Sequence, residues 1–116
     1  MAHHNITKAK AQQQHAMTRL RQRYGLELNK NDYCNIVSII KKASTGREAE
    51  AEFITRQSNR VSVWKVLYAG FQLVAVYDRM RKTVCTFLPP ECASRKAIVW
   101  NCCNELQDYW HDLQYS

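Results

Sequence analysis

"RVSVWKVLYAGFQLVAVYDRMRKTVCTFLP", residues Arg60 to Pro89, is the stretch that decides the fold of this 116-residue chain. Apolar and polar residues alternate along 60–68, as they do in a strand whose two faces have different surroundings. Short turn-like segments separate this strand from two more, 71–78 and 83–89. Strands joined so closely pair antiparallel, so the stretch predicts a meander. The alternation places Val61, Val63, Lys65 and Leu67 on one face of the first strand and Ser62, Trp64, Val66 and Tyr68 on the other.

Two helices and a weaker strand are predicted before this meander. Residues 6–24 are rich in Ala, Gln, Lys, Arg and Met, and Gly25 follows them as a natural stop, which favours a helix. A second helix is predicted over 28–44, with Asn29 as a cap and an acidic residue in the first turn. The segment 51–59, "AEFITRQSN", reads as a weak strand, so the sheet has three or four strands. The second helix should bury Tyr33, Ile36, Val37 and Ile40, which recur at helical spacing.

A third helix is predicted after the sheet. Pro89 and Pro90 end the strands, because proline cannot donate to a β-ladder, and residues 93–113 return to helical spacing. The predicted fold is therefore α+β, with two N-terminal helices packed on a three- to four-stranded antiparallel sheet and a C-terminal helix. The length predicts a single domain over 1–116. Within it we expect a frayed N-terminus at 1–8, a core at 13–90 and a C-terminal helical extension at 91–116.

The formal charge of +7 is unevenly spread along the chain. Residues 1–50 carry nine Lys or Arg against four acids, and residues 51–90 carry six against two. Residues 91–116 reverse the balance, with two basic residues against four acids. Such a basic body favours a polyanionic partner, with nucleic acid first and an acidic protein second. The alternative is that the charge only keeps the protein in solution.

Cysteine usage and the missing motifs restrict the class of protein further. Five cysteines without a CxxC pair, and no signal-peptide pattern, predict a reduced cytoplasmic protein. Apolar runs are too short for a membrane span. Cys102 and Cys103 make no zinc spacing with His111 or Cys92, so no metal is expected. No GxGxxG, P-loop or paired-carboxylate pattern occurs, and no cofactor is predicted.

The first predicted helix carries residues that could act on RNA. His15 can transfer a proton near neutral pH, and Arg19 follows one helical turn later on the same face. Cleavage of RNA without a metal needs such proton transfer and a cation at the phosphate. In the alternative interpretation, His15 is an ordinary polar residue, and Arg19, Arg21 and Arg23 only solvate the helix.

The predicted sheet adds further candidates. Lys65 lies on a strand face whose other residues are apolar. If that face opens to a groove, its ammonium group could contact phosphate. If it does not, the aliphatic stem extends along the sheet. Thr86 and Tyr77 carry hydroxyls that can donate to phosphate, although both types are also common in strands. The strand ends and turns carry cations that could track a nucleic-acid backbone or could merely aid solubility, namely Arg56, Arg60, Arg79, Arg81 and Lys82.

Three segments together, "HAMTRLRQRYGLELNKNDY", "RVSVWKVLYAGFQLVAVYD" and "KTVCTFLP", resemble small phage and toxin proteins of the barnase, EndoU, colicin and RelE-like ribonuclease superfamily. The resemblance covers roughly residues 13–90. It implies helices on one face of a curved antiparallel sheet and metal-independent RNA cleavage that leaves a 2′,3′-cyclic phosphate. In that comparison a helix histidine, a following arginine and a threonine in the final strand match His15, Arg19 and Thr86.

The predicted C-terminal helix lies outside this resemblance. It offers Trp100, Tyr109 and Trp110 as contacts for a host protein, a cognate inhibitor or a second copy of the chain. The leading hypothesis is an endoribonuclease in which His15 transfers protons, Arg19 and Lys65 stabilise the phosphate and Thr86 donates to it. The alternative is a non-catalytic phage or mobile-element protein that inhibits a host protein or binds nucleic acid, because such folds also serve as binding modules.

Overall fold

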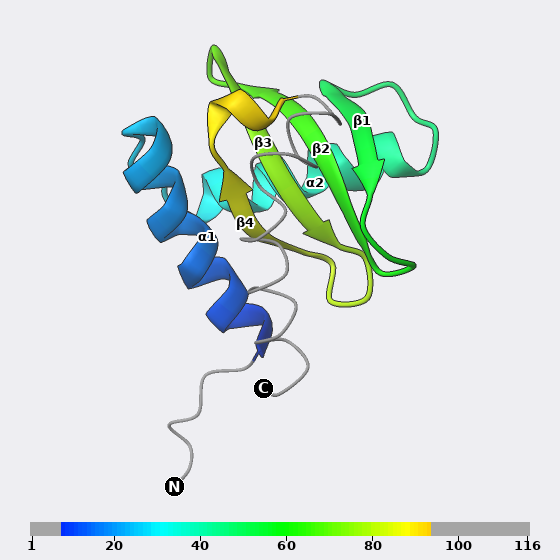
Figure 1. The fold of residues 1–116 in the computed structure, drawn as a ribbon, viewed down its shortest axis with the longest axis horizontal. Helices are drawn as coiled ribbons and strands as arrows, with labels where there is room; N and C mark the ends of the chain where they lie inside the picture. Colours follow the sequence, from blue (N-terminus) through cyan, green and yellow to red (C-terminus); the bar gives the residue numbers. More distant parts are fainter. Residues whose placement is uncertain (1–7, 94–116) are drawn as a thin grey trace, which may run out of the picture.

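The computed structural model describes residues 8–93, which form two helices followed by a four-stranded antiparallel sheet (Figure 1). The strands pair in sequence order, β1-β2-β3-β4, as the meander pattern predicts. The predicted order of two helices and then strands is confirmed, with the weak first strand present. The elements are α1 (Lys8–Tyr24), α2 (Lys30–Ser44), β1 (Ala51–Arg56), β2 (Val61–Tyr68), β3 (Phe71–Asp78), β4 (Thr83–Leu88) and a 3₁₀ turn, η2 (Pro90–Cys92).

Helix α2 begins at a capping box. The Asn29 side chain accepts a hydrogen bond from the Asp32 amide at 2.8 Å, and the Asp32 carboxylate accepts one from the Asn29 amide at 3.0 Å. The two bonds satisfy donors that a helix start otherwise leaves free. The predicted apolar stripe is confirmed, because Tyr33, Ile36, Val37 and Ile40 are all buried.

The two faces of the sheet carry separate apolar clusters, as the alternation predicts. Trp64 and Val66 of β2 lie in the cluster that includes Leu20 of α1 and Ile40 of α2. We call this the helix face. The opposite face of the sheet holds the second cluster, whose buried members are Val61, Val63, Val74, Val76, Cys85, Leu88 and Cys92.

Helix α1 runs beside β4 and covers the edge of the sheet there (Figure 1). Arg23 donates to the Phe87 carbonyl at 2.8 Å, and the Tyr24 hydroxyl donates to the Leu88 carbonyl at 2.7 Å. Tyr33 of α2 donates to the Val84 carbonyl at 2.7 Å and accepts from the same residue's amide at 2.9 Å. These side chains occupy backbone groups of β4 that would otherwise invite pairing with another chain.

Several details differ from the predictions or lie outside the described residues. Lys8 belongs to α1 instead of a frayed end, and Ala93 follows a 3₁₀ turn and is not helical. The remainder of the predicted C-terminal helix lies outside the described residues. Cys34 and Cys85 form no disulfide, whereas Cys92 is disulfide-bonded, which differs from the expectation of a fully reduced chain. No helix within residues 8–93 is long and apolar enough to span a membrane.

Candidate functional site

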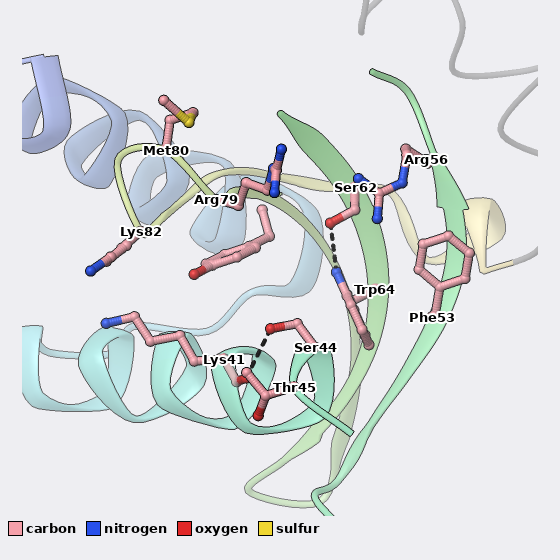
Figure 2. A pocket seen from close by; sticks show the side chains of 11 residues that line it. Lys41, Ser44, Thr45, Phe53, Arg56, Ser62, Trp64, Arg79, Met80 and Lys82 are labelled. Carbon is pink, nitrogen blue, oxygen red and sulfur yellow. Dashed lines mark hydrogen bonds between the residues drawn. The ribbon is translucent and has the colours of Figure 1, made fainter. Parts of the chain in front are cut away.

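A pocket of about 720 Å³ opens on the helix face of the sheet, beyond the C-terminal turn of α2 (Figure 2). Its floor is made by β1, β2 and β3, and its sides by α2 and the turn between β3 and β4. The volume lies in the usual range for small-molecule sites, about 300–1,000 Å³. The lining residues are Lys41, Ser44, Thr45, Phe53, Arg56, Ser62, Trp64, Tyr77, Arg79, Met80 and Lys82.

The pocket is strongly cationic. Lys41, Arg56, Arg79 and Lys82 line it, and none of the described lining residues is acidic. Four like charges around one cavity repel each other, and a low-dielectric wall strengthens that repulsion. An anion in the pocket would relieve it, so the charge of this site favours a phosphate-bearing or other anionic ligand.

One wall of the pocket is aromatic. Phe53 of the edge strand β1 is 47% exposed, and its ring packs edge to face on Trp64 with centroids 5.5 Å apart and planes at 76°. This T-shaped arrangement is favourable for aromatic pairs. The Trp64 indole N–H donates to the Ser62 hydroxyl at 2.8 Å, which fixes the ring that supports Phe53. Phe53 therefore presents ring surface to solvent from a supported position.

A β-bulge in β1 brings Arg56 to the same face as Phe53. Phe53 pairs with Trp64 and Thr55 with Val63, so β1 contains one extra residue, Ile54, against β2. Without a bulge, residues three apart would lie on opposite faces. The extra residue re-aims the strand, and Arg56 lines the pocket instead of facing away.

Arg56, at the end of β1, and Arg79, in the turn between β3 and β4, donate to one backbone oxygen. Arg79 donates through Nε to the Asn59 carbonyl, and Arg56 donates through Nη1 to the same oxygen at 3.5 Å. Asn59 lies in the turn between β1 and β2. The shared acceptor holds the two guanidinium groups close together at the pocket, with most of their N–H donors left for a ligand.

Tyr77 adds a neutral donor to this cationic site. Burial raises the pKa of its hydroxyl, and the neighbouring Asp78 carboxylate raises it further, so the group stays protonated at neutral pH. Among the described residues, the Tyr77 hydroxyl has no hydrogen-bond partner, although the side chain lines the pocket. It is therefore free to donate to a ligand.

Lys82 reaches the pocket from a strained backbone position. Its φ is +56°, in the left-handed region that residues other than glycine adopt at a cost. Figure 2 shows its side chain at the same end of the pocket as that of Lys41. Strain of this kind is often retained at functional sites.

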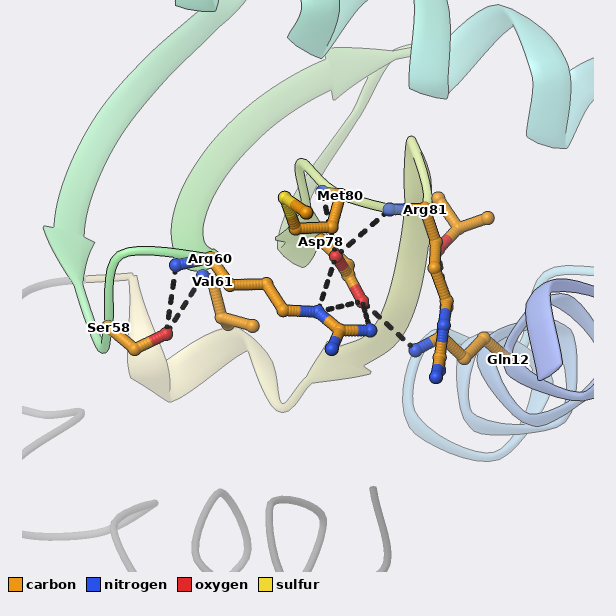
Figure 3. Close-up of polar contacts among 8 residues, drawn as sticks. Gln12, Ser58, Arg60, Val61, Asp78, Met80 and Arg81 are labelled. Carbon is orange, nitrogen blue, oxygen red and sulfur yellow. Dashed lines mark hydrogen bonds and ion pairs between the residues drawn. The ribbon is translucent and has the colours of Figure 1, made fainter. Parts of the chain in front are cut away.

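A buried polar cluster below the same turn is structural (Figure 3). Asp78 is fully buried and accepts from Arg60 Nε at 2.9 Å, from Gln12 at 3.3 Å and from the amides of Met80 and Arg81. An ion pair of 2.7 Å joins the Arg60 Nη2 to the same carboxylate. Burial alone would raise the pKa of Asp78, but the bonds from Arg60, the Arg81 amide and Gln12 outweigh it and hold that pKa below its ordinary value.

The four residues predicted for catalysis are not gathered at this pocket. His15 and Arg19 lie on α1, where Arg19 donates to Gln22 at 3.1 Å. Lys65 pairs with Glu52 of β1 at 3.0 Å, and Thr86 is buried in β4. Register places Lys65 and Thr86 on the same face, opposite the helices, but two strand spacings or roughly 10 Å apart.

The cations predicted for nucleic-acid binding divide into two groups. Arg56, Arg79 and Lys82 line the pocket. The others lie elsewhere. Arg60 is paired with Asp78, and Arg81 is half-buried near the polar cluster around Asp78. On α1, Arg23 donates to the Phe87 carbonyl and Arg21 is exposed. Trp100, Tyr109 and Trp110, predicted for partner binding, lie outside the described residues.

The sequence interpretation did not select Lys41, Phe53 or Trp64 for the site. Lys41 lies in the last turn of α2, where a cation is favoured anyway, and the aromatic residues fit ordinary strand positions. One signal was present: Phe53 and Arg56 both lie within a strand that was predicted to be weak, 51–59.

Comparisons with known proteins leave the family open. Neither protein-family models, curated proteins nor solved structures give a match to this chain. The fold is a small α+β arrangement of two helices on a four-stranded antiparallel sheet, and the ribonuclease resemblance depends on sequence pattern alone. Within residues 8–93 no three His, Cys, Asp or Glu side chains are grouped to hold a metal ion.

Proposed function

We propose that this protein binds single-stranded RNA through the cationic and aromatic pocket between α2, β1 and the β3–β4 turn. The observation that supports the proposal is the combination, in one cavity, of four cations and an exposed aromatic ring, with no acid among the described lining residues. Single-strand binding proteins pair positive grooves with aromatic side chains in this way.

Each part of the pocket has a role in this proposal. Arg56, Arg79, Lys41 and Lys82 neutralise phosphates and release counterions. Phe53, supported by Trp64, offers a face on which a base stacks, a contact worth about 1–3 kcal/mol per base. A duplex keeps its bases stacked inside, so a single strand suits the pocket better than a double helix.

Cleavage of the bound RNA stays a separate prediction. Among the residues the structure describes, the pocket is lined by no histidine or carboxylate that could transfer protons, and the candidates His15 and Arg19 belong to α1. RNA binding does not need them. The choice of RNA over DNA is supported by the sequence resemblance, so DNA of the same sequence is part of the test.

The test is fluorescence anisotropy with a labelled single-stranded RNA, the matching DNA and the RNA duplex. The double variant Lys41→Gln/Lys82→Gln should weaken RNA binding and lower the slope of log K against log salt by about 0.7 for each lost phosphate contact. Arg21→Gln/Lys30→Gln is the matched control, because it also removes two charges and both residues are exposed cations away from the pocket. Equal effects of both changes would reduce the proposal to general charge attraction.

A second arm separates binding from cleavage. Wild type and His15→Ala are incubated with RNA in excess EDTA, and the fragment ends are analysed. New 2′,3′-cyclic phosphate ends with wild type alone would support the ribonuclease hypothesis. Intact RNA that is nevertheless bound would support binding without cleavage.

A further inference from the structure

We infer that the pocket holds one unstacked nucleotide with its two flanking phosphates on two separate cation pairs. The inference rests on the proposed function and specifies the ligand: a nucleoside carrying phosphate on both its 3′ and 5′ oxygens, as each internal nucleotide of a strand does. Figure 2 shows the arrangement, with Lys41 and Lys82 at one end of the pocket and Arg56 at the other beside Phe53.

The arginine pair makes the first phosphate site. Arg56 and Arg79 share the Asn59 carbonyl as an acceptor, so their guanidinium groups converge although they come from different hairpins. The shared bond uses Nε of Arg79 and one Nη of Arg56. The remaining N–H groups can form the paired hydrogen bonds that arginine makes with phosphate oxygens.

The lysine pair makes the second site. Lys41 comes from the last turn of α2 and Lys82 from the β3–β4 turn. Within residues 8–93, neither ammonium group has a carboxylate partner. Two unpaired ammonium groups at one end of a cavity supply a compact positive charge that suits one phosphate.

The base has a defined place at the Phe53 end of the pocket, beside the arginine pair. The exposed ring of Phe53 supplies a stacking surface, and the Tyr77 hydroxyl is an available donor at the floor. A cavity of about 720 Å³ with one exposed ring suits one base better than a stack of several. The bases before and after it would lie outside.

The inference is tested by calorimetric titration of the full chain with adenosine 3′,5′-bisphosphate, adenosine 5′-monophosphate, adenosine 3′-monophosphate and pyrophosphate. The bisphosphate should bind about tenfold more tightly than either monophosphate, because each phosphate gains charge-assisted hydrogen bonds. Pyrophosphate, which has the charge but no base, should bind more weakly than the bisphosphate.

Two double variants separate the two ends. Lys41→Gln/Lys82→Gln and Arg56→Gln/Arg79→Gln should each reduce bisphosphate affinity to that of a monophosphate. In one double variant the 3′-phosphate should no longer add to the affinity of the ligand. In the other, the 5′-phosphate should no longer do so. Urea unfolding confirms that both variants are folded. Loss of the same phosphate in both variants would overturn the inference, as would pyrophosphate binding as tightly as the bisphosphate.

Failure of this inference is distinguishable from failure of the proposed function. RNA binding that depends on the pocket, with no preference for the bisphosphate over a monophosphate, would overturn the two-site arrangement alone. Tight bisphosphate binding without RNA binding would support the two-site arrangement and overturn the proposed function.

Discussion

Gln12, in the first half of α1, donates a hydrogen bond to the buried carboxylate of Asp78 at the end of β3, 66 positions later in the chain. The same glutamine accepts from the Thr83 hydroxyl at the start of β4. Through these bonds one polar residue in the helix contacts both strands that flank the β3–β4 turn (Figure 3). The turn carries Arg79 and Lys82 into the pocket, so the cluster positions the candidate site from below.

Replacing Asp78 should destabilise the fold strongly. Asp78→Asn removes the carboxylate charge that pairs with the partly buried Arg60, and losing this ion pair should cost about 2 to 3 kcal/mol. Gln12→Ala removes hydrogen bonds but no charge, and it should cost about 1 kcal/mol. Urea unfolding measures both free energies. Losses below about 0.5 kcal/mol in both variants would mean that the cluster does not secure α1.

The same carboxylate should make stability depend on acid pH. The pKa of Asp78 is lower in the folded protein than its unfolded value of about 3.9, so its contribution is complete above that pH and is lost as pH falls through the lower folded value. The free energy of unfolding of wild type should therefore decline below about pH 4 more steeply than that of Asp78→Asn. Urea titrations from neutral to acid pH compare the two, and parallel curves would contradict the assignment.

The hairpin between β2 and β3 can be made more stable. Ala69 has φ +53° and Gly70 has φ +82°, the positive values of a two-residue turn that prefers Asn-Gly. Ala69→Asn should stabilise the protein by about 1 kcal/mol, because asparagine tolerates this conformation better than alanine. Gly70→Ala is the control with the opposite sign and should destabilise the protein, because alanine is strained at this positive φ. A new Cβ there would meet no atom within 4 Å, so the effect would come from backbone strain alone. Thermal unfolding reports both shifts.

Thr86 offers a test that separates structure from catalysis. Its hydroxyl oxygen is buried and has no hydrogen-bond partner among the described residues. Thr86→Val keeps the shape and removes an unsatisfied polar group, so it should raise stability by about 1 kcal/mol. RNA cleavage that disappears in this more stable variant would instead support the catalytic role predicted from sequence. Unchanged behaviour toward RNA would contradict the catalytic role predicted for Thr86.

Lys82 should show a trade between stability and binding. Lys82→Gly relieves a positive φ and should gain about 1 kcal/mol in stability. It also removes one of the four pocket cations, so RNA affinity and its salt slope should fall. Lys41→Gln, in a helix with ordinary geometry, should lower affinity without the gain in stability. A Lys82→Gly variant that binds as tightly as wild type would exclude Lys82 from the interface.

Local patterns predicted most of the fold. The alternation in β2, the apolar stripe of α2 and the Asn29 cap depend on neighbours a few residues apart, and each is present. The buried Gln12 escaped prediction because its partners are distant in sequence, and a polar residue in a helix usually points to solvent. Pairings of that kind arise only when the chain is folded.

The candidate site was less predictable than the fold. Arg60 and Arg56 occupy similar places in the sequence, at the two sides of one turn, yet Arg60 pairs with Asp78 and Arg56 lines the pocket. From the sequence alone, a basic residue near a strand end gives no indication of whether it forms a buried ion pair or lines a pocket. The distinction depends on strand register and on one carboxylate from another hairpin.

The bulge at Ile54 has a consequence for how the pocket responds to a change in the length of β1. Deletion of that single residue would leave Phe53 and Arg56 two positions apart in a regular strand, so both side chains would stay on the helix face. The pairing of β2, β3 and β4 would be untouched. The arginine pair therefore tolerates the loss of one codon in β1, because the bulge absorbs the change in length.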